Sequence, residues 1–559
     1  MALPMRPTED AWLAGAPRFA TDRLARTEAG SGAEAAWREA MADPAAVAQA
    51  QGHFAVGIGD GSGSTLLAVD RFATETLCYR EDGGRLRFAE RADALAERPD
   101  DIDPQALYDY LYFHAIPSPR TVFRGVRRLP PGHCLRHDAV QGLRLARYWT
   151  PSFDEAETSF DDARRRFLEL LRQAVERQLD GSRPACFLSG GTDSSTVAGL
   201  IGQVAGRPAA SYSIGFEAEG YDEMEYARIA ARHFGTEHHE HYLTPAEMAR
   251  LIPELAAHHD QPFGNSSALP SYFCALRARA DGITRLLAGD GGDELFGGNS
   301  RYAKQSVFAW YEGIPGGLRH GLLEPVADGG LLDRVPLLKK GASYVRQARV
   351  PMPDRLQTYN LLARIGEAEV LTPAFIAQVR RDGPREQERA VWDESRGASF
   401  VNRMLAYDWR YTLAENDLPK VRMSSRLAGV SVGYPLLDQA LVDFSSRLPS
   451  NYKLRRLKLR WFFKEALRGF LPDAIITKKK HGFGLPFGVW LAREPALQAL
   501  ARDSVRGVGE RGIVRREFGD ALVDRLLPEH PGYYGEMVWI LMMLEQWFRH
   551  HAPDWRLAG

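Results

Sequence analysis

Short β-favouring runs dominate the chain between about residues 50 and 150. The runs HFAVGIGD, TLLAVD, TLCYR and RLRFA are separated by Gly, Ser or Asp-Gly, a spacing typical of an antiparallel sheet. Residues 128–138 and 147–155 indicate the last hairpin of this sheet and the linker that leaves it. Because residues 1 to about 50 are only weakly periodic, they predict no particular element. We therefore expect β-rich structure over roughly residues 50–150, within an N-terminal domain that spans residues 1–155.

From residue 156 onwards, the pattern changes to an alternation of helices and strands. Residues 161–179 place Phe167, Leu170 and Val175 on one face at helical spacing. Strand-like and helical stretches then follow one another as PACFLSGG, SYSIGF, YDEMEYARIAARHFG, HHEHYL and ITRLLAGD. Such alternation predicts an α/β fold with a mostly parallel sheet and covering helices. This second domain spans residues 156–559 and is expected to be helical towards the C-terminus.

Composition narrows the range of partners and the compartment. Lys and Arg number 71 against 72 acidic residues, so the net charge of −1 gives no field that would attract nucleic acid or an anionic membrane. The four cysteines are widely spaced without a CxxC pair, which favours a reducing cytoplasm over a disulfide framework or a zinc site. No run reaches about 18 uninterrupted apolar residues. We expect no membrane insertion and interpret VWILMMLEQWF at 538–548 as a buried helix.

The most informative motif is the turn FLSGGTDSS at residues 187–195, between an apolar strand and a helix. Two adjacent glycines let successive backbone N–H groups and the positive end of the helix converge on an anion. Three serine hydroxyls add donors, and Asp193 offers an oxygen ligand for Mg²⁺. An ordinary Gly-rich connection is the alternative. Since the chain has no GxxxxGK[ST] loop, the motif favours pyrophosphate with its metal over transfer of a γ-phosphoryl group.

Three separated blocks resemble one family. SGGTDSS is similar to the signature loop of ATP pyrophosphatases, which adenylate a carboxyl or carbonyl oxygen and release pyrophosphate. LLAGDGGDELFGGNSRY at 286–302 resembles the matching block of glutamine-dependent asparagine synthetases. YPLLDQALVDFSSRLPSNYKL and KKKHGFGLPFGVWL complete that family's order of motifs. The resemblance spans about residues 160–550 and implies an adenine nucleotide α-hydrolase-like fold. β-Lactam synthetases and lasso-peptide cyclases share this domain.

The resemblance implies the residues of an ATP site. Those expected to contact ATP or pyrophosphate are Phe187, Leu188, Ser189, Gly190, Gly191, Asp193, Ser194, Ser195, Ile214, Ala288 and Gly289. Asp193 and Asp293 would hold Mg²⁺ on the departing pyrophosphate, since Mg²⁺ prefers oxygen ligands. Acidic residues in Gly-rich turns also cap helices, and this structural role is the alternative.

The resemblance also implies catalytic residues around the acyl-adenylate. Asp290 has the position of a catalytic acidic residue or tyrosine. Lys480 matches a lysine that stabilises charge while the amine attacks, whereas its neighbour Lys478 is expected on a solvated face.

The segment before Pro435 departs from the family pattern. Ser431 and Gly433 stand where the family has a glutamate and an arginine, so the pocket for a standard amino-acid substrate is expected to differ. Glu415 and Asp417 are the candidates for a replacement acid beside Asp290.

The N-terminal domain resembles the latter half of a class II glutamine amidotransferase domain. GHFAVGIGD and residues 66–90 carry this likeness. The family nucleophile is a cysteine at the very N-terminus, but here Met1 is followed by Ala2 and no cysteine precedes Cys78. Because a thiol nucleophile needs a thiol, we expect a degenerate domain over 1–155 without glutaminase activity.

These observations lead to the hypothesis of a carbon–nitrogen ligase that uses ATP and Mg²⁺ and forms AMP and pyrophosphate. It would adenylate a substrate carboxylate and couple it to an amine, as in lasso-peptide cyclisation or lactam formation. A peptide precursor and a partner protease would then be its partners. Asparagine synthesis from aspartate and ammonia is the alternative, and an inactive nucleotide-binding scaffold is an alternative of another class. The sequence leaves the oligomeric state open, a homo-oligomer included.

Overall fold

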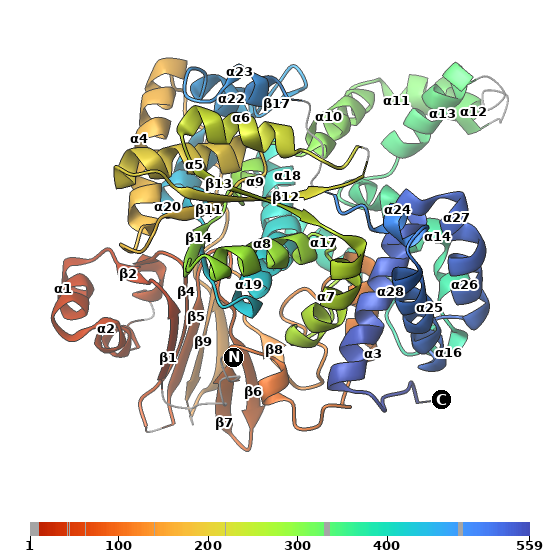
Figure 1. Cartoon of the computed structure of the whole chain (residues 1–559), viewed down its shortest axis with the longest axis horizontal. Helices are drawn as coiled ribbons and strands as arrows, with labels where there is room; N and C mark the ends of the chain where they lie inside the picture. Colours follow the sequence, from red (N-terminus) through yellow and green to blue (C-terminus); the bar gives the residue numbers. More distant parts are fainter. Residues whose placement is uncertain are drawn as a thin grey trace.

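The computed structural model describes residues 11–558, except residues 42, 44, 62, 139, 219, 329–335 and 479–483. Figure 1 shows the antiparallel strands of the N-terminal region below a second sheet, with the C-terminal helices beside both. The segment between the last N-terminal strand and the next helix, residues 148–159, contains the predicted domain boundary at 155/156.

Antiparallel sheets form the N-terminal region, which confirms the strands predicted after residue 50. The structure also has strands and helices before residue 50, where the sequence predicted none. The elements are β1 (Ala11–Gly15), β2 (Arg18–Phe19), α1 (Asp22–Ser31), α2 (Ala33–Ala40), η1 (Val47–Gln49), β3 (Ala50–Gln51), β4 (Phe54–Gly59), β5 (Thr65–Val69), β6 (Cys78–Asp82), β7 (Arg85–Ala89), η2 (Asp93–Leu95), α3 (Pro104–Phe113), β8 (Arg127–Arg128), β9 (His133–Asp138) and β10 (Gly142–Arg147).

Strand β4 lies between two layers of this region. The main sheet has the order β1-β4-β5-β9-β10, and a smaller sheet has the order β7-β6-β8. Phe54 and Val56 pack with residues of α1 and α2, whereas Ala55 packs with the smaller sheet. Because successive side chains of a strand point to opposite faces, both faces of β4 are buried and its sequence is apolar throughout.

A five-stranded parallel sheet with the order β13-β12-β11-β14-β15 is the centre of the second region. It confirms the predicted α/β fold and the helix predicted at 161–179. The elements are α4 (Phe160–Gln178), β11 (Ala185–Phe187), α5 (Thr192–Ala205), β12 (Ala210–Phe216), α6 (Met224–Phe234), β13 (Glu237–Leu243), α7 (Pro245–His258), α8 (Ala268–Ala280), β14 (Arg285–Leu287), α9 (Gly292–Phe296), α19 (Leu418–Leu427) and β15 (Ser431–Gly433).

Neighbouring residues of each central strand face different apolar cores. Ala185 and Leu286 pack with α7 and α8, whereas Cys186 and Leu287 pack with α4, α5 and α6. Helices therefore cover both faces of the sheet, as expected of parallel strands. The carboxyl ends of β11 and β14 lie side by side, and ligands of open parallel sheets bind at such an edge.

The remaining segments are mostly helical. They are α10 (Ser300–Glu312), α11 (Gly316–Leu318), η3 (Arg319–Leu323), α12 (Glu324–Asp328), α13 (Pro336–Ala348), η5 (Asp354–Tyr359), α14 (Leu361–Ile365), α15 (Glu367–Val370), α16 (Pro373–Ile376), α17 (Gly383–Asp393), α18 (Phe400–Asp408), η6 (Trp409–Asp417), η7 (Pro435–Leu437), α20 (Gln439–Arg447), α21 (Ser450–Lys453), β16 (Leu454–Arg455), β17 (Lys458–Leu459), α22 (Trp461–Ala466), α23 (Asp473–Thr477), α24 (Phe487–Leu491), α25 (Pro495–Glu510), α26 (Arg516–Ala521), η8 (Leu522–Leu526), α27 (Leu527–Glu529) and α28 (Pro531–His551).

Helix α28 joins the N-terminal region to the rest of the molecule. It lies against α3 in Figure 1, where the Tyr110 hydroxyl donates to the Ile540 carbonyl at 2.8 Å. Trp547 Nε1 donates to the His259 carbonyl at 3.1 Å, and its ring lies against Phe123. These contacts belong to one apolar core that takes residues from both regions. As predicted, VWILMMLEQWF is part of a buried helix, and among the described residues no helix has the length and apolar character to cross a membrane.

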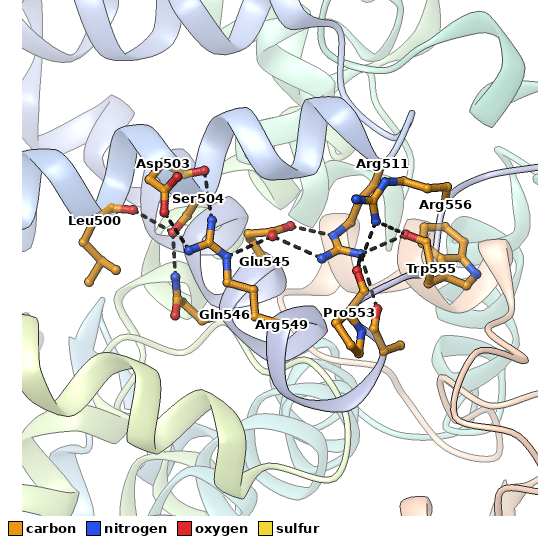
Figure 2. A network of polar contacts seen from close by, with 11 residues as sticks. Leu500, Asp503, Ser504, Arg511, Glu545, Gln546, Arg549, Pro553, Trp555 and Arg556 are labelled. Atoms are coloured by element: carbon orange, nitrogen blue, oxygen red, sulfur yellow. Dashed lines mark hydrogen bonds and ion pairs between the residues drawn. The ribbon is translucent and has the colours of Figure 1, made fainter.

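A buried polar cluster holds the end of the chain against α28 (Figure 2). Arg511 Nε donates to Glu545 at 2.7 Å, and Arg511 Nη1 donates to the Trp555 carbonyl at 2.8 Å. Arg549 donates to the same carboxylate at 3.0 Å and reaches Asp503 on α25. Because carboxylate and backbone oxygens accept from the Arg511 guanidinium, its burial is compensated.

Candidate active site

The turn after β11 exposes the start of α5 to a cavity. Gly190 has φ +70°, and a Cβ at this position would overlap the backbone of Ala227, so glycine is required here. Ser194 Oγ accepts from the Ser189 backbone N–H at 3.2 Å and lies 3.1 Å from Ser189 Oγ. No side chain caps the N-terminus of α5 within the described chain. The turn therefore presents backbone donors and a positive helix end, as an anion site requires.

A second glycine-rich turn, after β14, packs directly against the first. A Cβ at Gly289 would overlap the backbone of Ser194, and a Cβ at Gly292 would overlap the Asp193 carboxylate. Gly291 has φ +99° and starts helix α9, on which Asp293 lies. Close approach of the two turns brings together acidic residues that are about 100 positions apart in sequence.

Asp193 and Asp293 converge on one guanidinium, that of Arg460. Arg460 Nη1 lies 2.7 Å from Asp193 Oδ2, 2.8 Å from Asp293 Oδ1 and 2.9 Å from Thr192 Oγ1. Burial lowers the pKa of Arg460, but the two aspartates outweigh it and raise the pKa above its ordinary value. In the described part of the chain, two carboxylates face this guanidinium, and a divalent cation would fit such a pair.

Asp290 forms a second charged group in the same cavity, with Lys420 and Asp417. Lys420 Nζ lies 2.9 Å from Asp417 Oδ1 and 3.6 Å from Asp290 Oδ1. Burial raises the pKa of Asp290 to about 6, against the opposing effect of Lys420. Although burial opposes it, Asp417 and Asp290 raise the pKa of Lys420, which therefore stays charged. An acid that titrates near neutrality beside a permanent cation is suited to proton transfer.

Both groups line one cavity of about 970 Å³. The predicted site residues that line it are Phe187, Leu188, Ser189, Gly191, Asp193, Ser194, Ile214, Gly289, Asp290 and Asp293. Drug-sized ligand pockets have volumes of roughly 300–1,000 Å³, so this one has room for a nucleotide and part of a second substrate. The fold thus brings most of the predicted ATP-site residues together at one edge of the parallel sheet.

The arrangement fits Mg²⁺ by donor chemistry. Two carboxylate oxygens, from Asp193 and Asp293, lie within 3 Å of the same Arg460 nitrogen, close enough to reach one cation. Mg²⁺ in nucleotide sites is commonly bound by one or two carboxylates together with phosphate oxygens. No group of three or more His, Cys, Asp or Glu side chains forms a metal cage in the described part of the chain. The residues present therefore suit a metal that arrives with phosphates.

Comparison with known proteins agrees with this geometry. A model of the asparagine synthase domain matches residues 166–549, which is more than half of the chain. The chain belongs to the asparagine synthase family. A model of the glutamine amidotransferase domain matches residues 35–149, within the N-terminal sheet region.

Family relatives match most of this chain and a smaller share of their own length. "Asparagine synthetase [glutamine-hydrolyzing] 1" of Bacillus subtilis is 26% identical over 436 residues, which cover 76% of this chain and 66% of that protein. "Putative asparagine synthetase [glutamine-hydrolyzing]" of Mycobacterium bovis is 27% identical over 461 residues, covering 80% and 67%. "Amidase chyE" of Penicillium rubens is 27% identical over 279 residues, covering 45% and 40%. The chain therefore spans about two thirds of the length of the two synthetases.

The structure corrects the prediction for Glu415. This member of the family has Glu415 in a buried cluster with the N-terminal region, where its carboxylate accepts from Ser118 Oγ at 2.6 Å and Arg128 at 3.0 Å. Arg410 donates to the same carboxylate. Glu415 is absent from the cavity lining, whereas Asp417 lines it. The π-helical stretch η6, which spans both residues, turns Glu415 towards the domain interface and Asp417 towards Asp290.

Three predicted ATP-site residues do not line the cavity. Ser195 and Ala288 are buried behind its wall, and the Ala288 N–H donates to the Gly433 carbonyl. Gly190 shapes the turn without lining the cavity. The predicted contact of these three residues with ATP stays a prediction.

The basic run near residue 480 differs in part from expectation. Lys478, expected on a solvated face, lines the cavity with only 10% of its side chain exposed, and its ammonium lies 3.1 Å from Glu223 Oε1. Lys480 lies outside the described residues, so its predicted role stays a prediction.

Sequence reasoning missed Arg460 and Lys420. Arg460 lies in LKLRWFFKEAL and follows several other basic residues, and such a basic segment before a helix is typical of a solvated surface. Lys420 follows a proline in a helix-like segment with no motif of its own. The aspartates that Arg460 contacts, and Asp290 near Lys420, lie more than 120 positions away along the chain, so only the folded arrangement of the turns reveals these pairs.

Proposed function

We propose that this chain is an ATP-dependent carbon–nitrogen ligase that forms AMP and pyrophosphate. One observation carries the proposal: an anion-binding turn with two converging carboxylates and a separate proton-transfer group share one cavity. Membership of the asparagine synthase family supports the same reaction class.

In the proposed reaction, ATP binds with its phosphates on the turn at 189–194 and its adenine near Ile214. A substrate carboxylate oxygen attacks the α-phosphorus, the bond to pyrophosphate breaks, and an acyl-adenylate forms. Mg²⁺, held by Asp193 and Asp293, would offset the charge of the leaving pyrophosphate. An amine then attacks the acyl carbon, AMP leaves with the bonding electron pair, and Asp290 accepts the proton from the amine. Lys420 holds Asp290 in place, and the single cavity holds the adenylate close to the attacking amine.

The N-terminal region supports an amine source other than glutamine. The four cysteines of the chain are all buried. Burial raises the pKa of each thiol above its ordinary value, which disfavours the thiolate needed for nucleophilic attack. We therefore propose a separate amine, or an amine within the same substrate, as in lactam or lasso-peptide ring closure.

The altered β15 supports a substrate other than aspartate. Ser431 is exposed at the start of this strand, and its Oγ donates to the Thr284 carbonyl. A Cβ at Gly433 would overlap Leu287, so this position has no room for a family-type arginine side chain without rearrangement. Asparagine synthesis remains the second candidate because two relatives are named as asparagine synthetases.

The deciding experiment measures pyrophosphate and AMP release with three substrate sets. These are a peptide carrying a carboxylate and an amine, aspartate with ammonia, and aspartate with glutamine. We expect release with the peptide and no glutamate from glutamine. Strong release with aspartate and ammonia would favour asparagine synthesis, and ADP with inorganic phosphate as products would contradict adenylation.

The variant Asp193→Asn distinguishes an enzyme from an inactive scaffold. We expect pyrophosphate formation to fall by roughly 100-fold or more, because several kcal/mol of charge stabilisation at the leaving group is lost. Asp443→Asn is the matched control, since Asp443 is exposed and pairs with Arg71 away from the cavity. Equal activity in both variants would contradict the metal assignment.

A further inference from the structure

Arg460 is fixed more firmly than a surface arginine would be. Its side chain is 5% exposed, and its guanidinium carbon lies 4.0 Å from the centre of the Phe463 ring. Its backbone N–H donates to the Gly297 carbonyl, which ends the helix that carries Asp293. Arg460 also has φ +54°, in the left-handed region that few non-glycine residues adopt. The chain thus holds this side chain in place from three directions.

The guanidinium contacts the oxygen atoms that a divalent cation would need. It donates to both oxygens of Asp193 and to one oxygen of Asp293. Mg²⁺ takes carboxylate oxygens at about 2.0–2.1 Å, and a cation at that distance would meet the positive charge of Arg460 at close range. Arg460 and the metal therefore compete for the same pair of carboxylates.

Phosphate groups would resolve this competition. Guanidinium binds phosphate in the same forked geometry as carboxylate. The anion-binding turn at 189–194 lies next to Arg460, since Arg460 also contacts Thr192 at the start of α5. A pyrophosphate on this turn would offer oxygen atoms to Arg460 and leave the two aspartates to the metal.

We propose that Arg460 is a built-in competitor of the metal: it occupies Asp193 and Asp293 until phosphates arrive and then binds the phosphates. The inference rests on the pyrophosphate site of the proposed function. It follows that the protein binds free divalent cation weakly and takes up metal together with ATP or pyrophosphate. Arg460 thereby prevents the two aspartates from trapping metal before the nucleotide is present.

The test compares Mn²⁺ binding to the full chain with and without pyrophosphate, measured by the electron paramagnetic resonance of free Mn²⁺. Without pyrophosphate, Arg460→Met should bind Mn²⁺ about tenfold tighter than the unaltered chain, a change of about 1.4 kcal/mol. With Mn²⁺ saturating, the same variant should bind pyrophosphate about tenfold more weakly, because a phosphate ligand is lost. A purely structural role would weaken both.

The matched control is Arg455→Met. Arg455 lies on the hairpin just before Arg460, is exposed, and does not itself line the cavity, although it stacks on Trp461, which does. This variant loses the same charge and should change neither affinity. The double variant Asp193→Asn with Arg460→Met should lose the gain in Mn²⁺ affinity, since the gain requires the Asp193 carboxylate.

Unchanged or weaker Mn²⁺ binding in Arg460→Met would overturn the proposal. If Arg460→Met does not fold, Arg460→Lys gives a second test: it keeps the charge but loses the fork, so Mn²⁺ affinity should rise less than tenfold and pyrophosphate affinity should still fall. Improved pyrophosphate binding in Arg460→Lys would also contradict the proposal. These are binding measurements, so they decide the role of Arg460 even if no ligase activity is found, and a failed ligase assay leaves them interpretable.

Discussion

Arg511 and Arg460 are both buried against carboxylates, but only Arg460 lines a large cavity. Arg511 lies between Glu545 and the backbone carbonyls of the C-terminal segment (Figure 2). Arg460 lies between Asp193 and Asp293 and lines the large cavity.

The balance of donors and acceptors separates the two clusters. Glu545 serves two arginines, and the other acceptors of Arg511 are backbone oxygens that no ligand could replace. Arg460 faces two carboxylates, and its buried Nε has no hydrogen-bond partner among the described residues. The two clusters thus differ in whether a ligand could replace the partners of the arginine.

The largest expected effect comes from removing the charge of Glu545, the carboxylate that Arg511 and Arg549 share. Glu545→Gln leaves two arginines without their shared carboxylate, so the free energy of unfolding should fall by about 3–5 kcal/mol. Asp503→Asn removes only the exposed partner of Arg549 and should cost about 1 kcal/mol or less. Urea denaturation of both variants measures the difference. Similar losses in the two variants would show that the Glu545 cluster contributes no more to the free energy of unfolding than a surface ion pair does.

The same substitution, glycine to alanine, can be made beside Asp193 in the cavity and beside Glu545 in the buried cluster. A Cβ at Gly292 would overlap Asp193, and a Cβ at Gly507 would overlap Glu545. Overpacking typically costs about 1–3 kcal/mol. Gly507→Ala should therefore lower the melting temperature and spare pyrophosphate formation in the folded protein, whereas Gly292→Ala should reduce pyrophosphate formation by about tenfold or more by displacing Asp193.

The control for the glycine pair is Gly202→Ala on α5, where nothing lies within 4 Å of the added carbon. It should leave pyrophosphate formation unchanged and raise the free energy of unfolding by about 0.5–1 kcal/mol. If Gly292→Ala behaved like this control, the tight packing of the two turns would have no role in holding Asp193.

The smallest expected effect is the change of turnover with pH that ionisation of Asp290 in the large cavity would cause. Burial raises the pKa of Asp290 from an ordinary 3.8 to about 6. As a proton acceptor it must be ionised, so turnover should fall as the pH drops below about 6, and Asp290→Asn should remove this dependence along with most activity. If the residual activity of Asp290→Asn fell at the same pH, the titrating group would be a residue other than Asp290.

Ionisation of Asp290 should have opposite effects on turnover and on stability: turnover rises with pH, whereas the free energy of unfolding falls. Between about pH 3.8 and 6 the folded chain keeps a proton on Asp290 that the unfolded chain releases. Its contribution to the free energy of unfolding therefore falls as the pH rises through this window. Thermal denaturation of the unaltered chain and of Asp290→Asn across the window isolates the contribution.

Most of the fold could be predicted from the sequence because local patterns reported it. Helical spacing predicted α4, and alternation of apolar strands with helices predicted the parallel sheet. Elements before residue 50 were missed because they are short and α1 carries few buried residues to mark its face. The face of a short helix is set by its tertiary partners.

The charged residues of the candidate site were predictable where glycine-rich turns mark them. Asp193, Asp290 and Asp293 lie within such turns and line the cavity. Glu415 and Asp417 are two positions apart, and sequence alone could not tell which one faces Asp290, because the π-helical backbone there shifts the usual helical facing. Arg460 pairs with Asp193 and Asp293, and Lys420 lies near Asp290, across distances in sequence that no local pattern encodes.

The contact of α28 with α3 affects which evolutionary changes the N-terminal region could tolerate. Point changes can silence chemistry in the N-terminal region one residue at a time. Deleting that region would expose one side of α28 and leave the Ile540 carbonyl, which accepts from Tyr110, open to water. An N-terminal region that had lost its reaction would thus be retained for its structural role.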